Sequence, residues 1–338
     1  MTALLWIVLI AAGLAAMLFI PDGTILGQMN NAYYTGETIR LPLSVQPYGV
    51  TIAIGAACAA AVFLLIRLAK GGRGRLPLQR SLAFLAGAVC FGFALSRLLY
   101  CLTSLIFYFN TAGAGAILRW WEGGMSMTGM LLGVLLSAAL TIRKEGNACE
   151  AAVPALMTAI AAARLAETFG TIGRGMNVEF ENIFAIPEEF ENVLNVWLIE
   201  LIAVLLIGTA VLIWRAADRR CPRGFGFLAA FLIFYGIVQI LMESLRKDQH
   251  MIWGFVKSQQ LFSFFLAFLL LMSFAWIRDR KAAVTAVFAA LAAGVFGLEK
   301  ALDRLNIPDG WLYLAFAALI AGALWFAVYV MRRKTNRA

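Results

Sequence analysis

Long apolar runs alternate with shorter polar connections along most of this chain. A helix needs about 20 mostly apolar residues to cross the hydrocarbon core of a bilayer, and about ten runs meet this test. They span residues 4–20, 48–66, 82–109, 125–142, 151–169, 193–214, 225–242, 258–276, 282–298 and 311–331. The pattern predicts an all-α polytopic membrane protein with about ten transmembrane helices, of which the third is long and the ninth is short.

The composition agrees with this prediction. Of the 338 residues, 62% are hydrophobic and 14% are charged, and the mean hydropathy is +0.83. Polar stretches stay below about thirty residues, so the chain has room for one bundled membrane domain and not for a separate globular one. The first run has no basic segment before it and no small-residue cleavage site after it, so we expect a retained anchor helix rather than a cleaved signal peptide.

Lysine and arginine residues are concentrated in alternate connections. The basic connections are 67–80, 143–144, 215–223, 278–281 and 332–337. By the positive-inside rule these face the cytoplasm, which places both termini there. The opposite connections are longer and richer in Gly, Asn and aromatic residues, so we expect the functional face on the outer side. The net charge of +9 follows from the basic connections, and no nucleic-acid partner is predicted.

The residues that usually bind metals or act as nucleophiles are scattered. The five cysteines include no CxxC pair, and we expect those in apolar runs to act as small packing residues. The sequence shows no Ser-His-Asp or Cys-His arrangement and no His/Asp/Glu cluster with metal-ligand spacing. We therefore predict no metal and no cofactor.

Two pairs of charged residues end apolar runs. Arg164 and Glu167 end the fifth run, and Glu243 and Arg246 follow the seventh, so each pair lies on one helix face. An ionised side chain at mid-bilayer costs roughly 2.5 to 3.5 kcal/mol on insertion scales, and such residues usually have a function. One interpretation is a structural ion pair between helices. We favour a shared polar cavity, because the predicted topology places both pairs toward the outer leaflet.

Gln239 extends this polar stripe, since it lies four residues before Glu243 and seven before Arg246. In hydrocarbon such a stripe must face protein, water or a ligand. Arginines at head-group depth suit a phosphate, because a guanidinium presents a planar fork of donors. Glu243 is compatible with two roles, holding an arginine in place or accepting a proton.

A glycine-rich segment opens the fourth run with the sequence Trp121-Glu122-Gly123-Gly124-Met125-Ser126-Met127-Thr128-Gly129. Paired glycines allow tight backbone turns, and their amides can face an anion at the following helix N-terminus. A turn that serves only packing is the alternative.

Taken together, these segments resemble bacterial prolipoprotein diacylglyceryl transferases from about residue 43 to residue 274. Residues 121–129 are similar to the family's Trp-x-Gly-Gly-x-Ser-Phe-His-Gly motif, and 164–167 with Gly175 resemble its Arg-x-Gly-Asn signature. Residues 235–246 resemble its Tyr-Gly-x-x-Arg-Phe-x-x-Glu-x-x-Arg segment. Shorter similarities occur at 48–49, 96–100, 200 and 260–263.

The resemblance implies a seven-helix transferase-like core over residues 43–280, preceded by an anchor helix and outer loop over 1–42 and followed by two additional helices over 281–338. It also implies that diacylglycerol passes from phosphatidylglycerol to the lipobox cysteine of a prolipoprotein signal peptide, in the bacterial cytoplasmic membrane, with release of glycerol phosphate. The implied catalytic residues are Arg164, Glu243 and Glu167. The implied substrate-binding residues are Arg246, Gln239, Tyr48, Arg97, Gly123, Gly124, Ser126, Thr128, Gly175 and Tyr235.

Three departures from the family pattern lie in the expected site. Thr128 stands where the family has histidine, Gln239 where it has arginine, and Glu167 where it has asparagine. Threonine does not titrate near neutral pH, so the obvious base is missing, and a charge that stabilises the leaving phosphate is lost. Three hypotheses follow. We favour a transferase with a rearranged site, in which Arg164 clamps phosphate and Glu167 or Glu243 takes the proton. The second is a catalytically lapsed homologue that binds phospholipid or lipoprotein, and the third is a transporter, which no internal repeat supports.

Overall fold

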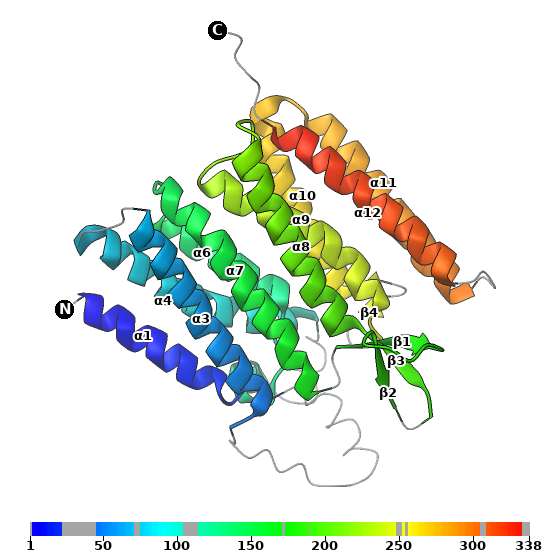
Figure 1. The fold of residues 1–338 in the computed structure, drawn as a ribbon, viewed down its shortest axis with the longest axis horizontal. Helices are drawn as coiled ribbons and strands as arrows, with labels where there is room; N and C mark the ends of the chain where they lie inside the picture. Colours follow the sequence, from blue (N-terminus) through cyan, green and yellow to red (C-terminus); the bar gives the residue numbers. More distant parts are fainter. Residues whose placement is uncertain are drawn as a thin grey trace.

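The computed structural model is a helical bundle in which the apolar runs lie side by side (Figure 1). It describes residues 2–21, 45–70, 75–103, 114–170, 173–188, 190–247, 252–253, 256–304 and 309–332. The α-helices of the described residues are α1 (Thr2–Met17), α3 (Pro47–Ala69), α4 (Arg75–Thr103), α6 (Met127–Thr141), α7 (Gly146–Ala166), α8 (Val196–Ala217), α9 (Phe225–Leu245), α10 (Ser258–Arg278), α11 (Lys281–Arg304) and α12 (Asp309–Met331). Most of the loop predicted before residue 42 lies outside the described residues.

The prediction of an all-α polytopic membrane protein with about ten helices is confirmed. Eight of the helices are long and apolar enough to cross a membrane, and α1 and α6 are shorter apolar helices. The predicted bounds differ where polar residues continue a helix. Helix α4 begins at Arg75 rather than at residue 82, and α11 has 24 residues although the apolar run within it is short. Hydropathy marks the hydrocarbon-facing part of a helix and does not mark its polar first and last turns.

Small residues allow the closest helix contacts. A Cβ atom added to Gly133 of α6 would lie 2.3 Å from the backbone nitrogen of Gly92 in α4, and one added to Gly55 of α3 would lie 2.1 Å from the Cβ of Ala162 in α7. Helices in membranes associate through this kind of close van der Waals packing. The α4–α6 and α3–α7 pairs are therefore fixed by the positions of their glycines and alanines.

Helix α9 lies at the centre of the bundle and is buried around most of its circumference. Phe227, Phe231 and Ile237 are among its fully buried side chains. It contacts α7, α8, α10 and α12. A helix that is apolar on all sides belongs in such a position, and the few polar side chains that it carries must find partners inside the protein.

The first helix and the last two lie on opposite flanks of this bundle. Figure 1 shows α1 in dark blue at one edge and α11 and α12 in orange and red at the other. Helix α1 contacts α3 and α4, whereas α11 and α12 contact α10 and α12 also contacts α9. The C-terminal pair is thus part of the packed bundle.

The connection between α7 and α8 folds as a small antiparallel sheet, which the all-helical pattern did not predict. Its strands are β1 (Arg174–Val178), β2 (Ala185–Pro187) and β3 (Asn192–Asn195), in the order β1-β3-β2. A two-stranded hairpin of β4 (Ile252–Trp253) and β5 (Val256–Lys257) precedes α10. Gly175 of β1 also pairs with Arg246 after α9, so the sheet is attached to the end of the central helix.

Candidate functional site

A cavity of about 230 Å³ lies where α7 and α9 end and α10 begins. Its walls differ in polarity. The apolar part comes from Met17, Ile20, Ile52, Ala56, Phe93, Met125, Met127 and Met130. The charged and amide side chains are Arg164, Glu167, Glu243, Arg246, Lys257 and Gln259. This division suits an amphipathic ligand, with an apolar part against the methionines and a polar part against the charges.

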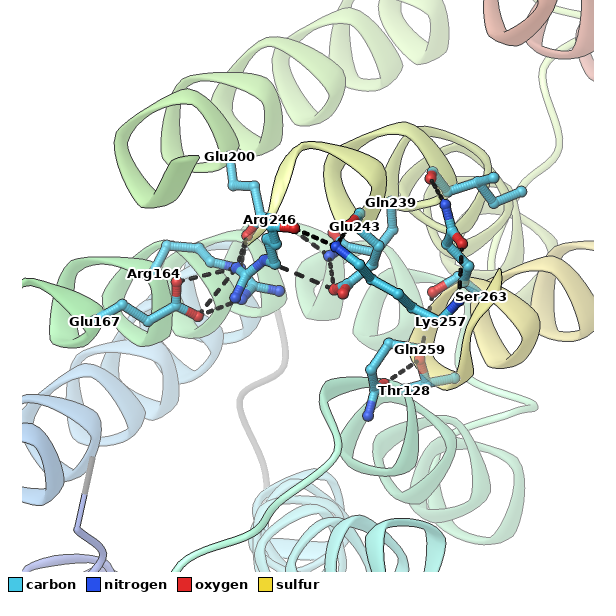
Figure 2. A network of polar contacts seen from close by, with 12 residues as sticks. Thr128, Arg164, Glu167, Glu200, Gln239, Glu243, Arg246, Lys257, Gln259 and Ser263 are labelled. Atoms are coloured by element: carbon cyan, nitrogen blue, oxygen red, sulfur yellow. Dashed lines mark hydrogen bonds and ion pairs between the residues drawn. The ribbon is translucent and has the colours of Figure 1, made fainter. Parts of the chain in front are cut away.

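Arg164 is 4% exposed, and it is held by side chains of the protein itself. Its Nε lies 2.7 Å from Oε2 of Glu200, and its Nη1 pairs with Glu167 one turn further along α7. Its Nη2 donates a hydrogen bond of 3.0 Å to the hydroxyl of Tyr235 in α9. The guanidinium of Arg164 is therefore held by two carboxylates, which Figure 2 shows, and by the hydroxyl of Tyr235.

Arg246 shares the same two carboxylates from the opposite side. Its Nη2 lies 3.0 Å from Oε2 of Glu167 and pairs with Oε2 of Glu200, while its Nε donates to Oε1 of Glu200 at 3.1 Å. Its Nε lies further, at 3.8 Å, from Oε1 of Glu243. Figure 2 shows the guanidinium of Arg246 between these carboxylates. The two charged pairs therefore meet in a direct ion pair between Glu167 and Arg246, and all four of their side chains also line the cavity.

Gln239 connects the network along α9. Its Nε2 donates to Oε1 of Glu200 at 3.1 Å and to Oε1 of Glu243 at 2.8 Å. The predicted stripe of Gln239, Glu243 and Arg246 thus faces protein on one side and the cavity on the other. A neutral amide at residue 239 orients two carboxylates without adding a charge to the network.

Lys257 and Glu200 are the main residues that the predicted site lacked. The Nζ of Lys257 donates to the backbone oxygen of Glu243 at 2.7 Å and also to that of Arg246. Lys257 precedes the first residue of α10 and lines the cavity. Glu200 is the shared partner of both arginines. Its position as an ionisable residue inside an apolar run is the sequence signal that could have identified it.

The charges of this network balance. Three carboxylates and three cations occupy it when every member is ionised: Glu167, Glu200 and Glu243, and Arg164, Arg246 and Lys257. Buried charges are tolerated when they are paired and hydrogen-bonded, as these are. An anionic ligand must therefore compete with Glu167 and Glu200 for the guanidinium groups.

The glycine-rich turn before α6 is held by Arg97. The Nε of Arg97 donates to the backbone oxygen of Ile117 at 3.0 Å, and its Nη1 donates to the oxygens of Gly123 and Gly124. Both glycines have positive φ angles, of 76° and 75°, and a Cβ atom on Gly124 would lie 2.3 Å from Cε1 of Tyr100. The glycine pair is thus required for the backbone path of this turn.

Thr128 lies in a cluster of hydroxyl and amide groups. Its Oγ1 is 3.5 Å from Oε1 of Gln259 and 3.5 Å from Oγ of Ser263, and the hydroxyl of Ser126 donates to the same Gln259 oxygen at 3.0 Å. In Figure 2, Thr128, Gln259 and Ser263 lie near Lys257 and away from Arg164, Glu167 and Glu200. These contacts join α6 to α10 and involve no titratable side chain.

The predicted site residues divide into two groups. Those on the cavity wall are Tyr48, Ser126, Arg164, Glu167, Glu243 and Arg246. Those outside the cavity lining are Arg97, Gly123, Gly124, Thr128, Gly175, Tyr235 and Gln239. The second group holds the wall in place. Gly175 illustrates this, since a Cβ atom there would lie 2.8 Å from the backbone oxygen of Leu245, directly before Arg246.

The chain is similar to known proteins over most of this bundle. The family model described as "Prolipoprotein diacylglyceryl transferase" matches residues 37–276, which contain α3 to α9 and all but the last two residues of α10. A relative named phosphatidylglycerol–prolipoprotein diacylglyceryl transferase from Symbiobacterium thermophilum is 29% identical over 259 residues, covering 71% of this chain and 91% of the relative.

Two further relatives carry the same name. The one from Leifsonia xyli subsp. xyli is 32% identical over 231 residues, covering 62% of this chain and 67% of the relative. The one from Listeria monocytogenes is 25% identical over 245 residues, covering 66% and 82%. Helices α1, α11 and α12 lie outside the matched residues. The chain therefore belongs to the prolipoprotein diacylglyceryl transferase family, as a multi-pass member with low identity to these relatives.

Proposed function

We propose that the protein is a divergent diacylglyceryl transferase that binds a phospholipid in the cavity lined by α1, α3, α4, α6, α7, α9 and α10. The observation that carries this proposal is the division of one cavity into a methionine- and isoleucine-lined wall and a wall of buried charges. Apart from Met17 and Ile20, the residues of both walls lie within those matched by the family model. An acyl chain would lie against the first wall, and the phosphate and glycerol groups of phosphatidylglycerol would lie against the second.

Lys257, Arg246 and Arg164 are the cations that would meet the phosphate. All three line the cavity, and phosphate oxygens accept hydrogen bonds from both guanidinium and ammonium groups. Binding would require Glu167 to give up part of its contact with Arg246. The free energy lost with that ion pair would be offset when the phosphate accepts hydrogen bonds from the same donors.

Glu243 is the best candidate for the proton acceptor. Its carboxylate lines the cavity, accepts a hydrogen bond from Gln239 and is 3.8 Å from the nearest guanidinium nitrogen of Arg246, further than Glu167 or Glu200. In the proposed reaction the thiol of a lipobox cysteine gives its proton to Glu243, and its sulfur forms a bond to the diacylglyceryl carbon. The bond from that carbon to the phosphate oxygen breaks, and glycerol phosphate leaves with the electron pair.

The orientation of the bundle is part of this proposal. We infer that the cavity end lies toward the outer leaflet of a bacterial cytoplasmic membrane and that the basic end, with both termini, lies in the cytoplasm. At the basic end Arg67 and Arg80 pair with Glu145, and Arg215 pairs with Glu150. We also infer that residues 43–280 form the transferase-like core, with 1–42 and 281–338 as additions.

A second candidate function is lipid or lipoprotein binding without transfer. One observation favours it, because both guanidinium groups are already engaged by Glu167 and Glu200. In this candidate function the charged network stabilises the fold, and the cavity binds an amphipathic ligand without transferring any group. Thr128, which has no titratable partner in its cluster, is consistent with this candidate.

A transfer assay with the purified full-length protein separates the candidates. The protein in detergent micelles is given phosphatidylglycerol and a synthetic lipobox peptide, and the thioether product is measured by mass spectrometry. Glu243→Gln should lower the initial rate by about 100-fold or more, the range for loss of a general base. Glu145→Gln, at the opposite end of the bundle, is the matched control and should retain the rate.

The outcomes are distinct. Product from the wild-type protein and from Glu145→Gln, with little from Glu243→Gln, supports transfer with Glu243 as base. Phosphatidylglycerol bound at a defined stoichiometry by native mass spectrometry, without product, supports the binding candidate and overturns the transferase. Neither bound lipid nor product overturns both.

A further inference from the structure

Helix α11 is connected to the polar network by a side-chain hydrogen bond to α10. The Oε1 atom of Glu299 accepts a hydrogen bond of 2.6 Å from Nε2 of Gln260 in α10. Gln260 is 2% exposed, and Glu299 lies on a helix outside the residues matched by the family model. Moving a carboxylate from water to a contact between two helices costs free energy, and the hydrogen bond to Gln260 offsets part of that cost.

Gln260 joins three elements through its one amide group. Its Nε2 also donates to the backbone oxygen of Ile240 in α9 at 3.1 Å, and its Oε1 accepts from the backbone nitrogen of Lys257 at 3.1 Å. An ionised carboxylate only accepts hydrogen bonds, so Glu299 requires the NH2 side of the amide to face α11 and α9. The carbonyl side is thereby directed at the amide of Lys257 and caps the start of α10.

Lys257 carries this connection to the cavity. Its ammonium group donates to the backbone oxygens of Glu243, in the last turn of α9, and of Arg246, the residue that caps α9 (Figure 2). The position of the last turn of α9 thus depends on Lys257, and the position of Lys257 depends on the amide of Gln260. Tyr313 of α12 adds a contact to the same turn, since its hydroxyl is 3.4 Å from the backbone oxygen of Ser244.

We propose that Glu299 is a positioning residue for the cavity, because it fixes the amide of Gln260 and through it the placement of Lys257, Glu243 and Arg246. The C-terminal helix pair thereby becomes a working part of the site. The role of Glu299 in placing these residues does not depend on which ligand the cavity binds. Its effect on lipid transfer rests on the function proposed above.

Hydrogen exchange of the full-length protein tests the placement role without any substrate. Glu299→Leu removes the acceptor and keeps a side chain of similar size, so α11 should remain packed and the thermal midpoint should not fall. The amide of Lys257 and the amides of residues 243–246 should exchange about fivefold faster, the change expected from losing one hydrogen bond. Amides of α3 should be unaffected.

Two further variants make the readout specific. Glu299→Gln keeps an acceptor oxygen and should preserve the exchange rates within about twofold. Lys300→Ala, an exposed neighbour on the same helix, should change nothing. Unchanged exchange in Glu299→Leu would overturn the proposal, as would a Glu299→Gln variant that behaves like the leucine variant.

The transfer assay then separates this inference from the proposed function. If the wild-type protein makes product, Glu299→Leu should lower the rate and Glu299→Gln should restore most of it. If the wild-type protein makes no product while the exchange results follow the expected order, the proposed transfer fails and the positioning role of Glu299 stands.

Discussion

Arg246 Nη2 lies 3.0 Å from Glu167 Oε2, although the two residues are 79 positions apart in the sequence. This pair joins the ends of α7 and α9 and places a carboxylate where an anionic head group would otherwise meet a guanidinium. Glu167 therefore has two opposite effects. It neutralises Arg246 and Arg164, which stabilises the network, and it would compete with the phosphate of a bound phospholipid for the same donors.

Replacement of Glu167 should reveal this competition. Glu167→Gln removes one buried negative charge and leaves the two guanidinium groups undercompensated, so the free energy of unfolding should fall by about 3–5 kcal/mol in the absence of lipid. Phosphatidylglycerol should then bind more tightly than to the wild-type protein, because its phosphate supplies the missing charge. Thermal unfolding with and without added phosphatidylglycerol measures both effects.

A matched control for this variant is Glu150→Gln, which removes a carboxylate paired with Arg215 at the opposite end of the bundle. It should not change the stabilisation that phosphatidylglycerol produces. Weaker lipid stabilisation of Glu167→Gln than of the wild-type protein would show that Glu167 assists lipid binding, contrary to this account.

Tyr235→Phe should lower stability without changing the charge of the network. The hydroxyl of Tyr235 accepts the Nη2 hydrogen bond of Arg164, and its removal leaves a buried guanidinium donor unsatisfied. The expected loss in the free energy of unfolding is about 1–3 kcal/mol. Differential scanning calorimetry in one detergent measures the loss, with Tyr329→Phe at a half-exposed position as the control. Equal stability of the two variants would refute the contribution of this bond.

Gly124→Ala should distort the turn that Arg97 holds. The φ angle of Gly124 is 75°, and the new Cβ would lie 2.3 Å from Cε1 of Tyr100. Backbone strain of this kind costs about 1–3 kcal/mol, and the steric overlap adds to it. Gly115→Ala is the control, because a Cβ there meets nothing within 4 Å. A thermal midpoint for Gly124→Ala equal to that of the control would show that the turn accepts a side chain.

The inferred orientation can be tested by labelling single cysteines in spheroplasts. In a variant without the five native cysteines, Ile183→Cys places a thiol near the exposed edge of the β1–β3 sheet region, and Arg80→Cys places one at the basic end. A membrane-impermeant maleimide should label residue 183 in intact spheroplasts and residue 80 only after permeabilisation. The reverse pattern would place the cavity end in the cytoplasm.

Much of the fold could be predicted from hydropathy, because a membrane helix must satisfy its own backbone and be apolar for about 20 residues. The same reasoning identified Arg164, Glu167, Glu243 and Arg246 as residues with a shared cavity. It missed the sheet that contains Gly175, since short strands in a polar connection have no strong period. The pairing of β1 with the end of α9 depends on contacts between segments far apart in the chain.

The site was harder to predict than the fold, because side-chain roles depend on which partner is closest. The sequence shows that Arg97 lies within an apolar run, but only the structure shows that its guanidinium donates hydrogen bonds to backbone oxygens of the glycine-rich turn. Lys257 gave no signal in the sequence, since a lysine directly before the polar first residues of a helix is not unusual. Its contacts with Glu243 and Arg246 arise from the folding of α10 against α9.

The central claim is that the cavity holds a phospholipid by its head group and one acyl chain. Photocrosslinking tests it most directly, with the full-length protein in nanodiscs that contain phosphatidylglycerol bearing a photoreactive acyl chain. We expect adducts on the cavity residues Ile52 and Met130 that disappear in Arg246→Ala, while adducts on the exposed Leu206 of α8 persist. Adducts confined to exposed positions such as Leu206, with none on the cavity residues, would contradict it.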